Sequence, residues 1–133
     1  MTHRADEILV VDDEPSNADT LATIFRQSGY QVTAVYSGAA ALAWITTRQP
    51  ALALLDVIMP ELDGIETAKQ IQASHPDCRI LLLSGNATTQ ELFEDAHKEG
   101  HNFEILAKPI PPLELLEKVA SLLNGRSQAA ARG

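Results

Sequence analysis

One of the most apolar runs of the sequence carries an aspartate. The run is ALALLDVIMP, from Ala51 to Pro60, and its acid is Asp56. A buried carboxylate is unfavourable unless a cation or hydrogen-bond donors pair with it. A second apolar run, EILVV, is followed directly by Asp12 and Asp13. The chain therefore offers three carboxylates at comparable positions, each at the end of an apolar run.

Two further polar side chains stand in the same kind of position. Ser84 ends the run RILLLS, and Lys108 directly follows the run FEILA. A hydroxyl donates hydrogen bonds and a lysine supplies a compact cation, so both suit the oxygens of a phosphoryl group. Three crowded carboxylates repel one another, and such hard oxygen ligands suit Mg²⁺. A carboxylate beside these cations can act as a nucleophile and form an acyl phosphate, and Asp56 is the candidate.

The elements that must position these side chains alternate along the chain. Short continuous apolar runs predict buried strands, and the segments between them have helical periodicity. The strands are expected at Glu7–Val11, Gln31–Tyr36, Leu52–Asp56, Arg79–Ser84 and Phe103–Ala107. The helices are expected from Pro15 to Gly29, after the capping residue Ser37, after Gly64, near Thr88–Glu99, and over Leu113–Leu123.

This alternation predicts an α/β fold with a doubly wound, five-stranded parallel sheet and helices on both faces. We expect a flavodoxin-like (βα)5 sandwich with strand order 2-1-3-4-5. Ligands in such sheets bind beyond the carboxyl ends of the strands, where the strand order reverses. In this order the first and third strands are neighbours, so Asp12, Asp13 and Asp56 should converge.

Each of these residues has a simpler interpretation when it is taken alone. Paired acids before a helix commonly cap it, and an aspartate after a strand commonly forms an Asx turn. Ser84 before Gly85 is typical of a turn, and Lys108 alone is typical of a solvated lysine. The combination favours a site, because these side chains follow four different strands and all fall on one edge.

Length and composition limit the class of protein. The 133 residues suit a single domain, over residues 1–124, with residues 125–133 as a flexible polar tail or the start of a linker. The net charge of -8 argues against a nucleic-acid surface. No apolar stretch is long enough to span a membrane, and the start MTHRADE lacks the apolar core of a secretory signal, so we expect a cytoplasmic protein.

Four motifs in order, LVVDDEP, LLDVIMPELDG, LLLSG and LAKP, resemble the receiver domain of two-component response regulators. The resemblance covers about Ile8 to Leu123. It implies that a histidine kinase or a histidine phosphotransfer protein donates a phosphoryl group to Asp56. It also implies that Mg²⁺ is held by Asp13, Asp56 and the backbone carbonyl of Ile58, with Asp12 assisting partly through water.

The resemblance further implies a switch. Ser84 would shift toward the phosphoryl group, Lys108 would pair with it, and the peptide bond from Lys108 to Pro109 would be cis. The surface around the fourth helix, the fifth strand and the fifth helix would then change to engage an unknown downstream protein. The formation of a dimer on phosphorylation is a further alternative. Many receivers carry an aromatic switch residue three positions before the lysine, where this chain has Ile105, with Phe103 two positions earlier.

Two other functions fit these residues less well. A phosphatase that uses an aspartyl nucleophile needs a second aspartate two positions later, where this chain has Ile58, so no general acid is evident. A pseudo-receiver typically loses an acid or the lysine, and this chain keeps them all. We therefore expect a phosphoacceptor that promotes its own phosphorylation and dephosphorylation without turnover of an external substrate. It is either a stand-alone receiver or a receiver cut from a larger protein.

Overall fold

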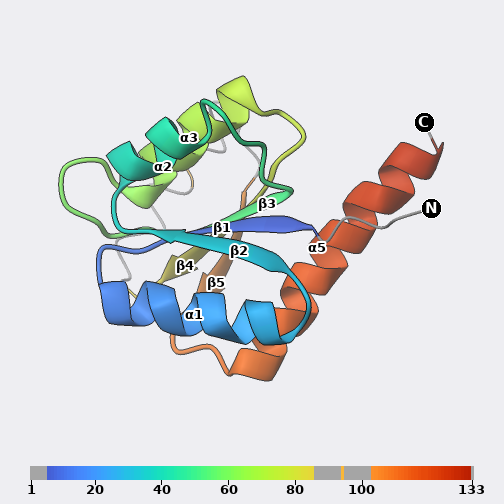
Figure 1. Ribbon diagram of the computed structural model, residues 1–133, viewed down its shortest axis with the longest axis horizontal. Helices are drawn as coiled ribbons and strands as arrows, with labels where there is room; N and C mark the ends of the chain where they lie inside the picture. The colour runs from blue at the N-terminus through green and yellow to red at the C-terminus, as the bar shows by residue number, and fades with distance from the viewer. Residues whose placement is uncertain (1–5, 86–93, 95–102, 133) are drawn as a thin grey trace.

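The computed structural model describes residues 6–85, 94 and 103–132, the last eight of these by their backbone only. Its strands form one parallel sheet with the order β2-β1-β3-β4-β5, which confirms the predicted topology (Figure 1). The strands are β1 (Glu7–Val11), β2 (Gln31–Val35), β3 (Leu52–Asp56), β4 (Arg79–Ser84) and β5 (Glu104–Ala107). β1 and β3 are therefore neighbours, as the convergence of the acids requires.

Helices cover both faces of the sheet. They are α1 (Pro15–Gln27), α2 (Gly38–Trp44), α3 (Gly64–Ser74) and α5 (Pro112–Arg132). α2 and α3 lie on one face, whereas α1 and α5 lie on the other (Figure 1). The helix predicted near Thr88–Glu99 lies, apart from Glu94, outside the described residues.

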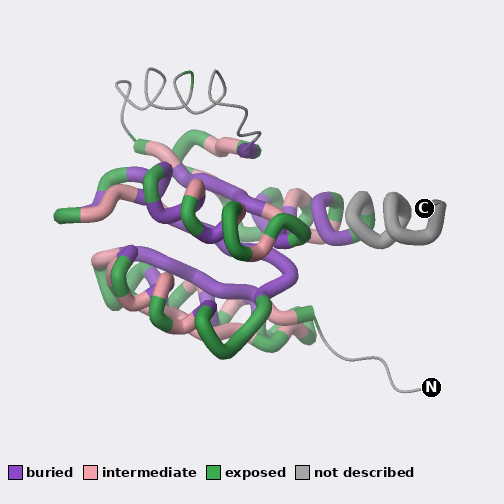
Figure 2. Tube along the Cα trace, turned by 90° about the horizontal axis from the view of Figure 1, so that it is seen from above, coloured by how far each residue is buried: buried purple, intermediate pink, exposed green. Residues whose placement is uncertain are grey.

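The continuous apolar runs of the strands follow from this double cover. Along β1, Leu9 and Val11 pack into the core under α2 and α3, whereas Ile8 and Val10 pack into the core under α1 and α5. All of these side chains are fully buried, and Figure 2 shows the buried trace running between the exposed outer faces of the helices. Because neither face of the inner strands meets water, polar side chains gather at the strand ends.

Local signals start the helices where the sequence predicts them. Pro15 stands in the first turn of α1, a position that needs no backbone N–H donor. The Ser37 hydroxyl accepts a hydrogen bond from the Ala40 N–H at 3.0 Å, which confirms the predicted cap of α2. Asp63 caps α3 in the same way, since its carboxylate accepts from the Glu66 N–H at 2.8 Å.

Some boundaries differ from the prediction. β2 ends at Val35, and β5 begins at Glu104. The prediction that the last helix ends near Leu123 is wrong, because α5 continues to Arg132 and extends beyond the sheet in Figure 1. Glutamine, alanine and arginine in this segment are good helix formers. They offset the loss of about 1 kcal/mol in helix stability that one interior glycine causes. That a linker begins at residue 125 stays a prediction.

Over the residues that the structure describes, no helix combines the length and the apolar character that crossing a membrane requires.

Candidate functional site

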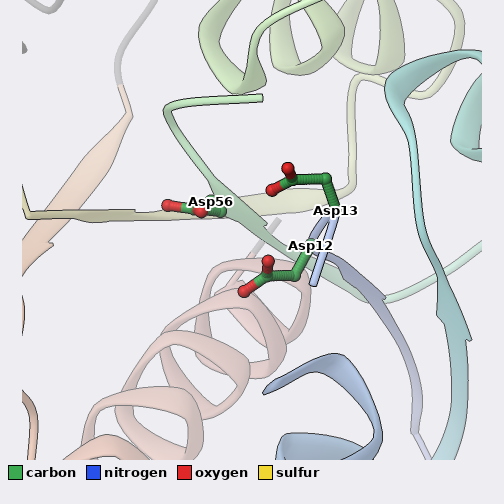
Figure 3. Close-up of side chains that lie close together, drawn as sticks. All are labelled: Asp12, Asp13 and Asp56. Atoms are coloured by element: carbon green, nitrogen blue, oxygen red, sulfur yellow. The ribbon is translucent and has the colours of Figure 1, made fainter. Parts of the chain in front are cut away.

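The strand register brings the three predicted acids together. Val11, the last residue of β1, pairs with Leu55 of β3. Asp12, which follows β1, is therefore next to Asp56, the last residue of β3. Asp12, Asp13 and Asp56 each place a carboxylate oxygen within 4.8 Å of the others. Figure 3 shows the three carboxylates gathered beyond the ends of β1 and β3. The predicted convergence is therefore present.

Asp12 is the most deeply buried member of the cluster. It is 2% exposed, and its carboxylate accepts a hydrogen bond from the Glu14 N–H at 2.9 Å. Burial raises the pKa of Asp12, and the negative charges of Asp56 and Asp13 add to this rise, whereas the Glu14 bond and Lys108 oppose it. These surroundings disfavour the ionised form of Asp12, so a cation bound beside the carboxylate would stabilise it.

Lys108 pairs with the predicted nucleophile. Its ammonium nitrogen lies 3.1 Å from Asp56 Oδ1, and the Asp56 side chain is only 13% exposed. The Lys108 backbone N–H donates to the Ser84 carbonyl at 2.7 Å, which fixes the start of the lysine next to the end of β4. The peptide bond between Lys108 and Pro109 is cis, as the resemblance implied. The carboxylate that ends β3 is therefore already matched by one cation.

Ser84 stands at the same edge, between the other two groups. β4 pairs with β3 on one side and with β5 on the other, with Asp56 opposite Leu83 and Ser84 opposite Ala107. Ser84 is half-buried. The end of β4 thus lies between the strand that carries Asp56 and the strand that leads to Lys108.

The donor set fits a hard divalent cation. Carboxylate oxygens and water are the ligands that Mg²⁺ prefers, and three carboxylates meet here with one ammonium opposite. Ile58, whose carbonyl is the further predicted ligand, lies in the loop 57–63 and is 47% exposed. The Val57 N–H donates to the Leu83 carbonyl at 3.0 Å, which anchors the start of this loop to β4. The role of the Ile58 carbonyl stays a prediction.

A cavity of about 310 Å³ adjoins the acid cluster on the side of α1. It shares Asp12 and Lys108 with the site, and Asn17 and Thr20 also line it. Its apolar lining comes from α1, β4, the segment after β5 and α5, through Leu21, Leu83, Pro109, Ile110 and Leu115. The sequence did not reveal this cavity, because residues from such distant segments carry no common local pattern.

The structure locates both candidates for the switch position. Ile105 pairs with Leu82 in an uninterrupted register and packs, half-buried, against the core under α2 and α3. Phe103 precedes β5 and is 4% exposed. Three positions before Lys108, β5 thus carries the aliphatic Ile105, and the aromatic ring of Phe103 is part of the core.

Comparison with known proteins decides the family. A family model described as "Response regulator receiver domain" matches residues 8–120. The chain belongs to this family. The receiver domain is 37% identical, over 94% of its length, to the alkaline phosphatase synthesis transcriptional regulatory protein PhoP of Bacillus subtilis. It is 39% identical, over 78% of its length, to the transcriptional regulatory protein ZraR of Salmonella typhimurium.

The receiver domain covers only part of these relatives, 51% of PhoP and 23% of ZraR. Among solved structures, it is similar to a CheY-like response regulator receiver domain protein from Methanospirillum hungatei. That match has a TM-score of 0.88 and 26% identity, over 95% of this chain and 99% of the other. The receiver domain of a signal transduction histidine kinase from Syntrophus aciditrophicus gives 0.80 and 28%, over 91% and 92% of the two chains. The fold and the family thus agree with the sequence interpretation.

Proposed function

We propose that this receiver domain accepts a phosphoryl group on Asp56 from a histidine kinase or a histidine phosphotransfer protein, and that the phosphorylated form signals to a downstream protein. One observation carries the proposal. Asp56 lies within 4.8 Å of two further carboxylates and 3.1 Å from the Lys108 ammonium, at the carboxyl edge of the sheet. Family membership supports the same assignment.

The chemistry follows from the positions of the side chains. A carboxylate oxygen of Asp56 attacks the phosphorus of the donor, the P–N bond of a phosphohistidine or the P–O bond of an acyl phosphate breaks, and an aspartyl phosphate forms. Lys108 neutralises charge on the phosphoryl oxygens, and the Ser84 hydroxyl donates a hydrogen bond to one of them. Mg²⁺, held by Asp12, Asp13 and Asp56 with the Ile58 carbonyl, would supply further charge neutralisation.

The switch would use the residues that lead away from the site. Ser84 ends β4, and Pro109 follows the lysine that pairs with Asp56. Ile105, three positions before this lysine, packs against the core under α2 and α3. Movement of Ser84 and Lys108 toward a phosphoryl group would shift the population between two arrangements of the surface formed by β5 and α5. A downstream protein or a second copy of the chain could bind to this surface. The place of action would be the cytoplasm.

Turnover of an external substrate is not part of the proposal. A phosphatase would need an acid to protonate the leaving group, and position 58 holds an isoleucine that is 47% exposed. A binding module without chemistry is disfavoured too, because the acids and the lysine are all retained and assembled.

Intact-mass measurement tests the proposal. With acetyl phosphate and Mg²⁺, the wild-type chain should gain one phosphoryl group, and Asp56→Asn should gain none. Asp77→Asn, an exposed acid at the opposite edge of the sheet, is the control and should react as the wild type does. An unchanged wild-type mass, also with a phosphorylated phosphotransfer protein, would indicate a pseudo-receiver. Continuous phosphate release from small phosphoesters would indicate an enzyme.

A further inference from the structure

Gly64 packs directly against the backbone of the phosphoacceptor. It is the first residue of α3 and is buried. Its N–H donates to the Val57 carbonyl at 2.8 Å. This bond joins the two ends of the loop 57–63, which carries the Ile58 carbonyl. The start of α3 therefore rests on the peptide that follows Asp56.

No side chain fits at this position. A Cβ built on Gly64 would lie 2.1 Å from the carbonyl oxygen of Asp56, 2.8 Å from its carbonyl carbon and 2.9 Å from the Cα of Val57. All three neighbours are backbone atoms. They have little freedom to move, because Asp56 pairs with Leu83 in the sheet and the Val57 N–H donates to the Leu83 carbonyl.

A side chain at position 64 would thus have to displace one of two structures. Either the end of β3 moves and carries the Asp56 carboxylate with it, or the start of α3 moves and the bond between Gly64 and Val57 breaks. The first changes the distances from Asp56 to Lys108 and to the other acids, and the second releases the loop that holds the Ile58 carbonyl. Both disturb the same site.

We propose that Gly64 is a positioning residue for phosphoryl transfer, because its missing side chain lets α3 fix the backbone of Asp56 and of the loop that follows. The proposal rests on the proposed function of Asp56. It concerns the placement of the acceptor and its ligands rather than the stability of the fold.

The chain contains a matched control for this residue. Gly38 is the first residue of α2 and is buried, and a side chain caps its helix as one caps α3. A Cβ at Gly38 would also be crowded, but mainly by side chains, with Thr67 Oγ1 at 2.3 Å and Leu62 Cδ2 at 3.0 Å, and by the Leu62 carbonyl oxygen at 3.0 Å. Gly38→Ala therefore crowds Thr67 of α3 and Leu62 near the end of the loop 57–63, and none of these three nearest atoms belongs to Asp56 or Val57.

The experiment compares Gly64→Ala with Gly38→Ala in three measurements: the thermal midpoint without metal, the Mg²⁺ dissociation constant by calorimetry, and the rate of phosphorylation by acetyl phosphate. Both variants should lose stability. Only Gly64→Ala should weaken Mg²⁺ binding, by about tenfold, and slow phosphorylation by about 10- to 100-fold, because a displacement of about 1 Å at a reacting group can cost about 10²-fold in rate.

Two results would overturn the positioning role. One is a Gly64→Ala variant that binds Mg²⁺ and reacts as the wild type does, and the other is an equal loss of Mg²⁺ affinity in both variants. If the wild type takes no phosphoryl group, the proposed function fails, while the comparison of Mg²⁺ affinities still tests Gly64.

A measurement on the wild type covers the case in which Gly64→Ala does not fold. Hydrogen exchange at the Gly64 amide should be as slow as at the amides of β3, with and without Mg²⁺, because this N–H is bonded and buried. Exchange at the rate of an exposed loop amide would show that α3 does not hold the acceptor strand.

Discussion

At the scale of single residues, the cluster of acids carries an energetic cost in the protein without metal. Asp12 is 2% exposed, and burial and the neighbouring carboxylates raise its pKa. The folded protein therefore holds this proton to higher pH than the unfolded chain does. Ionisation of Asp12 lowers the stability as the pH rises from the ordinary value of 3.8 to the raised one, and the loss persists above that range.

Asp12→Asn should for this reason raise the thermal midpoint at neutral pH in the absence of metal. The asparagine side chain can still accept the hydrogen bond from the Glu14 N–H, and it carries no charge. The gain should vanish below pH 3.8, where the wild-type carboxyl is protonated in both states. The variant should also lose most of the rise in midpoint that Mg²⁺ gives the wild type.

Thermal unfolding over a range of pH, with and without Mg²⁺, measures this effect. Asp77→Asn removes one negative charge at the other edge of the sheet and serves as the control for net charge. A variant Asp12→Asn that is less stable than the wild type at neutral pH without metal would contradict the argument.

Residue types and spacing predicted which residues meet, but they do not distinguish Asp12 from Asp13. Only the resemblance to receiver domains gave Asp13 as a direct ligand and Asp12 as an assisting one. Only the structure shows that Asp12 is buried and bonded to the Glu14 N–H, whereas Asp13 is half-buried. The difference depends on how the chain turns after β1, and the residue types there do not indicate the geometry of that turn.

At the scale of the elements, the loop 57–63 contains one unfavourable backbone conformation. Glu61 has a φ of 65°, in the left-handed region that glycine and asparagine adopt more readily than other residues. The left-handed region costs most L-residues about 1–2 kcal/mol. This conformation lies between Ile58, whose carbonyl is the proposed ligand, and Gly64, at the start of α3.

Glu61→Asn should therefore raise the free energy of unfolding by about 0.5–1 kcal/mol, since asparagine tolerates this conformation. Glu61→Ala is the matched control: it removes the same charge but leaves the backbone unfavourable, so it should not stabilise the protein. Chemical denaturation measures both. An equal gain in the two variants would show that the charge, and not the backbone conformation, is responsible.

Element order was more predictable than element ends. Pro15, Ser37 and Gly64 mark helix starts in the sequence, and continuous apolar runs mark the buried strands. The end of α5 was missed, because the apolar stripe in the sequence ends near Leu123, whereas the helix continues to Arg132. Hydrophobic periodicity predicts the apolar face of a helix, and it gives no boundary for a helix that continues into small and polar residues.

At the scale of the whole molecule, burial on both faces of the sheet confines the polar groups of the inner strands to the strand ends. The inner strands β1, β3 and β4 are almost entirely buried, and the three carboxylates and the Lys108 ammonium gather at their carboxyl ends. The alternation of strands and helices predicted this edge. The cavity beside it is lined by residues of both α1 and α5, which local patterns do not bring together.

The family assignment applies to this unit of the molecule. The receiver domain is matched over residues 8–120, and it covers about half or less of the curated relatives described above. The relatives' names refer to proteins with further segments, so their outputs are properties of those longer chains. What we propose for this domain is the acceptor site and the surfaces coupled to it.

Chemical mapping of the phosphorylated residue shows whether Asp56 is the acceptor. Borohydride reduces an aspartyl phosphate to homoserine, so peptide mass spectrometry after phosphorylation and reduction locates the acceptor in the wild-type chain. We expect homoserine at position 56 alone, and only when Mg²⁺ and a phosphodonor are both present. Homoserine at position 12 or 13, or none at all in a phosphorylated sample, would contradict this expectation.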